Sequence, residues 1–169
     1  MKTKPIVLGA CLLLSMSVAA YAQKVTTDFD KAATFSKFKT YAWIEGTPAK
    51  SPQMRERITE SIDKQLAAKG LLKIDKDSNP DLLVAYHAAS DVETQLYTSG
   101  WVYWGTSTTQ VERIPVGTLG VNIGTPKEKK YVWMGKATGT LSDKPEKVEE
   151  LISKAVAKMF KDFPPKVKS

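Results

Sequence analysis

Hydrophobic and polar positions alternate most regularly between residues 117 and 139. Leu119, Val121 and Ile123 alternate with small or polar residues, which is the period of a strand with one buried face. A short polar turn separates this run from a second one that contains Val132 and Trp133. The pattern predicts a β-hairpin over 117–139. Its second strand has apolar residues on both faces, so we expect it inside the sheet with Trp133 in the core.

Two other segments have the period of a helix. Apolar residues recur every three or four positions over 54–66 and over 148–160, which is typical of helices with one buried stripe. The first helix should begin with Ser51 as N-cap and Pro52 in its first turn, and should end at Gly70. The second should span 144–163 and end before Pro164.

The rest of the chain predicts shorter elements. Strands are expected at 24–30, at a segment ending with Trp43, and at 81–88, where the apolar run is almost continuous. Residues 89–116 are less regular, and we expect a long loop there. This order predicts an α+β fold, a mostly antiparallel sheet with two amphipathic helices packed on one face. We expect residues 23–169 to form a single domain.

The first 22 residues have the pattern of an export signal. Lys2 and Lys4 precede an apolar run over 6–20, and Ala20-Tyr21-Ala22 is typical of a cleavage site. These features predict a signal peptide at 1–22 and a mature protein in the periplasm. Cys11, the single cysteine, follows Leu-Gly-Ala and resembles a lipobox, so an outer-membrane lipoprotein anchored through Cys11 is the alternative.

Composition and residue spacing limit which partners, metals and cofactors are expected. The formal net charge is +7, but the basic residues are spread along the chain, which is typical of a soluble surface, and we expect no nucleic-acid partner. The sequence has no ligand spacing of a metal site and no glycine-rich phosphate loop opening a helix. We therefore expect no metal and no cofactor. The oligomeric state is not specified by the pattern.

The predicted elements carry short motifs that resemble a known family of bacterial envelope proteins, domain-of-unknown-function family 4136. The matching segments are 28–30, 35–43, 79–84, 117–119, 132–135 and 163–165, in the order typical of the family. Two positions depart from the pattern: Gly124-Thr125 stands where the family often has Asp, and Met134 where it often has Arg. The resemblance implies an exported α+β domain, often a lipoprotein, and it implies no known activity or catalytic residues.

An aromatic segment at 97–105 is the strongest candidate for a partner-binding site. It holds two tryptophans and two tyrosines between glycines, namely Tyr97, Trp101, Tyr103 and Trp104. Exposed aromatic rings can stack on a protein, glycan or lipid of the envelope. The alternative is that the segment folds back and buries its rings. The glycines argue against a rigid buried strand.

His87 is the only histidine and so the only candidate base of a hydrolase. Asp81, Ser90 and Asp91 are its neighbours in sequence, but no Gly-x-Ser-x-Gly motif accompanies them. We therefore expect a non-catalytic envelope protein that acts as a binding or structural module. An envelope hydrolase that uses His87 is the alternative.

Overall fold

The computed structural model describes residues 23–99, 108–127 and 130–165 of the 169-residue chain. Six strands form one sheet in the order β1-β6-β5-β4-β2-β3, and the neighbours are antiparallel except for the parallel pairs β2–β3 and β2–β4. The strands are β1 (Lys24–Phe29), β2 (Thr40–Trp43), β3 (Leu72–Lys73), β4 (Leu82–Ser99), β5 (Thr108–Thr125) and β6 (Lys130–Thr140). The helices are α1 (Pro52–Ala68) and α2 (Pro145–Met159). The predicted α+β class is confirmed.

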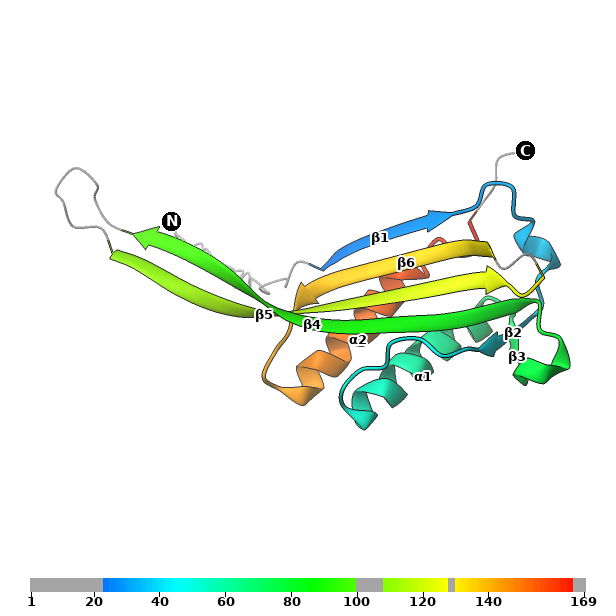
Figure 1. Ribbon diagram of the computed structural model, residues 1–169, viewed down its shortest axis with the longest axis horizontal. Helices are drawn as coiled ribbons and strands as arrows, with labels where there is room; N and C mark the ends of the chain where they lie inside the picture. Colours follow the sequence, from blue (N-terminus) through cyan, green and yellow to red (C-terminus); the bar gives the residue numbers. More distant parts are fainter. Residues whose placement is uncertain (1–22, 100–107, 128–129, 166–169) are drawn as a thin grey trace, which may run out of the picture.

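Both helices lie on one face of the sheet and contact each other (Figure 1). Alternate residues of the central strands point toward them, so that Leu82 and Val84 of β4 and Val121 and Ile123 of β5 are fully buried. The apolar stripes of the helices meet this layer through Ile58, Ile62 and Leu66 of α1 and through Val156 and Met159 of α2. The period of the sequence thus identified the buried faces.

The ends of α1 follow the sequence signals. Ser51 Oγ accepts a hydrogen bond from Met54 N at 3.4 Å, and Pro52 occupies the first turn, where its missing N–H leaves no bond unmade. Gly70 follows the last turn with φ of +82°, a conformation that favours glycine because a Cβ would be strained there. None of the helices in the described part of the chain is long and apolar enough to cross a membrane.

The predicted hairpin is confirmed as β5 and β6. Trp133 of β6 packs in the core. The side chain is 2% exposed and faces the end of α2, where its ring lies 4.8 Å from that of Phe160 and 5.4 Å from that of Phe163. β6 lies between β1 and β5, as expected of a strand with apolar residues on both faces.

A hydrogen-bonded cluster around Asp63 ties α1 to the strand β2. Asp63 Oδ1 accepts hydrogen bonds from Tyr41 Oη and Trp43 Nε1, each at 2.8 Å, and Lys73 Nζ lies 2.9 Å from Oδ2. Burial first, and then the hydrogen bond to the Asp63 carboxylate, raise the pKa of Tyr41 above its ordinary value. The cluster fixes how the helix sits on the edge of the sheet.

The prediction of a long loop over 89–116 was wrong. β4 continues to Ser99 and β5 starts at Thr108, and their antiparallel pairing runs without a break from Leu83–Gly124 to Ser99–Thr108. Beyond the Asp91–Val116 pair, no other described strand pairs with these two, and they project from the body as an arm (Figure 1). One backbone hydrogen bond, from Leu141 N to Pro115 O at 2.7 Å, links the base of the arm to the body. Because no other described helix or strand packs on this arm, alternation of apolar and polar residues was not required there, and the sequence pattern gave no signal for strands.

Candidate functional site

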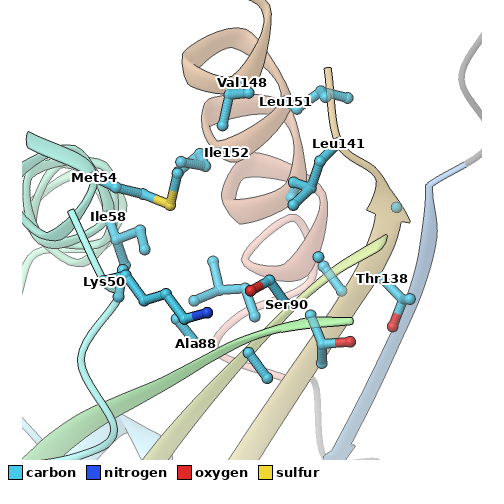
Figure 2. Close-up of a pocket in the computed structure, with 18 of the residues that line it drawn as sticks. Lys50, Met54, Ile58, Ala88, Ser90, Thr138, Leu141, Val148, Leu151 and Ile152 are labelled. Atoms are coloured by element: carbon cyan, nitrogen blue, oxygen red, sulfur yellow. The ribbon is translucent and has the colours of Figure 1, made fainter. Parts of the chain in front are cut away.

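An apolar pocket with a volume of about 520 Å³ lies between the two helices and the sheet. Figure 2 shows its walls: Met54 and Ile58 come from α1, Val148, Leu151 and Ile152 from α2, and Ala88 and Ser90 from β4. This volume lies within the range of about 300–1,000 Å³ found for small-molecule sites. The pocket lies where the arm leaves the body, beside Ser90 and Gly117.

The pocket exists because small residues of the sheet face the first halves of both helices. Ala88, Gly117, Ala137 and Gly139 form its floor. Farther along the same strands, larger residues fill the space beneath the second halves of the helices. The apolar stripes are therefore buried at their C-terminal ends, while Met54, Val148, Leu151 and Ile152 stay partly exposed. Where the apolar stripe of a helix extends past the sheet residues that bury it, apolar surface remains available to a ligand.

Leu141 closes one side of the pocket by lying directly on β5. A Cβ on Gly117 would come within 2.7 Å of Leu141 Cδ2, so glycine at this position allows the close approach. Gln23 closes the neighbouring side, where its Nε2 donates a 2.8 Å hydrogen bond to the carbonyl of Leu151. The first described residue of the chain therefore belongs to the pocket wall.

The described lining of the pocket carries a single charge. Lys50 is the only charged residue among the described residues that line the pocket, and Figure 2 shows its side chain extending from the loop before α1 toward the side of Ser90. No described carboxylate lies within ion-pair distance of Lys50. Ser51 and Met54 belong to the first turn of α1 and also line the pocket, so the positive end of that helix dipole lies beside Lys50.

The sequence matches the family described as Domain of unknown function (DUF4136) over residues 25–165. The chain belongs to this family. The resemblance inferred from the short motifs is thereby confirmed. A search of curated proteins found no match.

Solved structures share the fold of this DUF4136 chain at low sequence identity. A DUF4136 family protein from Bacteroides thetaiotaomicron is 18% identical over 84% of this chain and 96% of that one, with a TM-score of 0.55. A PelC dodecamer from Paraburkholderia phytofirmans is 14% identical over 82% and 95%, with a TM-score of 0.52. A PDZ domain protein from Parabacteroides distasonis is 19% identical with a TM-score of 0.57. In that last case the match covers 85% of this chain and 36% of the other.

His87 of the DUF4136 chain lies on the sheet face opposite the helices and is exposed. Its Nδ1 lies 3.2 Å from Thr47 N, which donates to it, and 3.0 Å from Thr47 Oγ1. Asp91 is four residues along the same strand, or about 13 Å away. Ser90 lines the pocket on the helix side. The structure does not bring the candidate acid and nucleophile to this histidine.

The Asp81 carboxylate lies at the other end of β4 and is hydrogen-bonded to the backbone at the start of β2. It accepts hydrogen bonds from Lys39 N at 2.8 Å and from Thr40 N at 3.0 Å, which together hold the start of β2 beside β4. The backbone N–H of Lys39 is the main cause that lowers the pKa of the Asp81 carboxyl. Asp81 therefore serves the fold, and it lies six residues from His87 along the strand.

Of the four predicted partner-binding aromatics, Tyr97 falls in β4, where its backbone pairs with Gln110 in the arm. Trp101, Tyr103 and Trp104 lie outside the described residues. The pocket residues had not been singled out from the sequence, because their apolar stripes had been assigned to the core.

Proposed function

We propose that the protein is a non-catalytic binding module of the bacterial cell envelope, and that the apolar pocket is its binding site. The observation that carries this proposal is the pocket itself, a volume of about 520 Å³ with a mostly apolar lining. Binding sites for small apolar molecules commonly have this composition. The distances that separate His87 from Asp81, Ser90 and Asp91 favour binding over hydrolysis.

The arm is a second surface for contacts in the envelope. Val92 is 56% exposed and Val111 is 61% exposed in its described part. Exposed apolar side chains on a two-stranded ribbon are suited to contact with another molecule. The aromatic residues Trp101, Tyr103 and Trp104 follow β4 in the sequence. We therefore propose that these aromatic residues and the arm together bind a partner in the envelope.

Pocket binding is tested with N-phenyl-1-naphthylamine, an uncharged apolar fluorophore. We expect saturable binding of one molecule per chain, with fluorescence that increases as the probe leaves water. Ser90→Trp places a large ring at the mouth of the pocket, and it should weaken binding by at least about tenfold because the ring competes for the same volume.

Val92→Trp is the matched control. Val92 lies two residues farther along the same face of β4 and is outside the pocket lining, so the same new side chain should leave probe binding unchanged. Equal binding by wild type and Ser90→Trp, or no saturable binding at all, would refute the pocket as the site.

The envelope location is tested by the mass of the purified protein. If residues 1–22 are removed by signal cleavage after Ala22, the mature chain begins at Gln23. We expect intact-mass spectrometry of protein from the periplasmic fraction to give that N-terminus. A mass that corresponds to acylated Cys11 would instead assign the protein to the membrane as a lipoprotein.

A further inference from the structure

The chemistry around the pocket specifies its ligand more closely than its shape alone. We propose that the pocket binds an amphiphile with one acyl chain and an anionic head group, and that Lys50 receives the head group. This inference rests on the proposed function, because it names the ligand class of the same site. Two features of the pocket support it, namely its volume and the position of its charge.

Volume limits the apolar part of the ligand. A cavity of about 150 Å³ holds one benzene molecule, so on that scale about 520 Å³ holds roughly 20 carbon atoms. That is enough for one long acyl chain and too little for the two chains of a diacyl lipid. Met54, Leu151 and Ile152 would contact the methylene groups on the helix side, and Ala88 and Ala137 would contact them from the sheet.

Charge determines the head group. The described lining contains Lys50 and no acidic residue, and the first turn of α1 adds the positive end of a helix dipole at the same mouth. An anion placed there gains both interactions, whereas a cation is repelled by both. Ser90 supplies a hydroxyl group at the rim that can donate to a carboxylate or a phosphate.

Fatty acids and phosphate-bearing lysolipids both have one acyl chain and an anionic head group. Three probes with the same alkyl chain and different head groups show which head group the pocket prefers. Dodecanoate, dodecyl phosphate and dodecyltrimethylammonium are titrated, below their micelle concentrations, against protein loaded with N-phenyl-1-naphthylamine. The protein is purified from cells that express the full chain. At least one of the anions should displace the fluorophore at a concentration about tenfold lower than the cation requires, as expected for one exposed ion pair together with a helix N-terminus. The preferred anion identifies the source of the ligand.

Lys50→Gln tests the residue directly. It keeps the length and polarity of the side chain and removes the charge, so the difference between the anions and the cation should shrink to less than about threefold. Lys64→Gln is the matched control, because Lys64 is an exposed lysine of α1 outside the pocket lining. That variant should keep the full preference for anions.

The outcomes separate this inference from the proposed function. If N-phenyl-1-naphthylamine binds but all three amphiphiles displace it equally, or if Lys50→Gln keeps the preference, the assignment of the anionic head group is overturned while the pocket remains a binding site. If the fluorophore does not bind, the proposed function itself fails. Binding that appears only after residues 1–22 are removed would assign the pocket to that apolar segment and would also overturn the amphiphile.

Discussion

Replacing Trp133 with Ala should lower the free energy of unfolding by about 3–5 kcal/mol, the cost of emptying a large aromatic site in a core. The ring is 2% exposed and packs against Phe160 and Phe163, and Phe163 in turn packs edge-on against Phe35 at 5.9 Å. Its loss would therefore leave a cavity where the end of α2, strand β6 and the segment before β2 meet. Urea denaturation followed by circular dichroism measures the change as a lower midpoint with a similar slope.

Met134→Ala is the control for this change. Met134 is the next residue of β6 and is 40% exposed, so its truncation should change stability by less than about 0.5 kcal/mol. If Trp133→Ala unfolded at the same urea concentration as the wild type, the packing of α2 on β6 would be assigned incorrectly.

The second large effect is expected at Asp63. Asp63→Ala removes the acceptor shared by Tyr41 Oη and Trp43 Nε1, and it leaves two donors without a protein partner in a partly buried site. A buried donor left unsatisfied costs about 1–3 kcal/mol, and water reaches part of this site, so the free energy of unfolding should fall by about 1–3 kcal/mol in total. The measurement is again the urea midpoint.

Asp63→Asn separates this acceptor from the ion pair with Lys73. The amide oxygen of Asn can replace Oδ1 and accept from both Tyr41 and Trp43, while the contact with the exposed Lys73 is lost. Exposed ion pairs contribute about 0–1 kcal/mol, so Asn should be much less damaging than Ala. Equal destabilisation by Asn and Ala would show that the charge, and not the shared acceptor, holds α1 to β2.

Periodicity was sufficient for the two helices and the central strands, because each of them has one face against the core. The two-residue strand β3 has both residues exposed and was not predicted. The stripe from Ile58 to Leu66 and the alternation from Leu119 to Ile123 both correspond to buried positions. The arm could not be recognised in the same way, because both of its faces meet solvent where they are described. Its residues are rich in Val, Thr and Ile, and this β propensity was the remaining signal for strands.

The pocket could not be predicted from sequence patterns, for a different reason. Its walls come from the start of the described chain, both helices and three strands, and its floor consists of small residues whose role depends on what faces them. A helix stripe shows which residues are apolar, but it does not show how far the opposite layer fills the space. Lys50 likewise carried no signal, because a lysine before a helix is ordinarily a solvated charge.

The register of the arm determines how its length can change. Adding or removing two residues in each strand beyond the Asp91–Val116 pair would shift its far end by about 7 Å and keep every side chain on its present face. A change of one residue in each strand would move every side chain beyond it to the opposite face. The strand pairing of the body would be unaffected in either case, because β6 pairs with β5 only from Val116 onward. The length of the arm therefore changes in steps of two residues per strand, and these steps set how far the Ser99–Thr108 pair stands from the body.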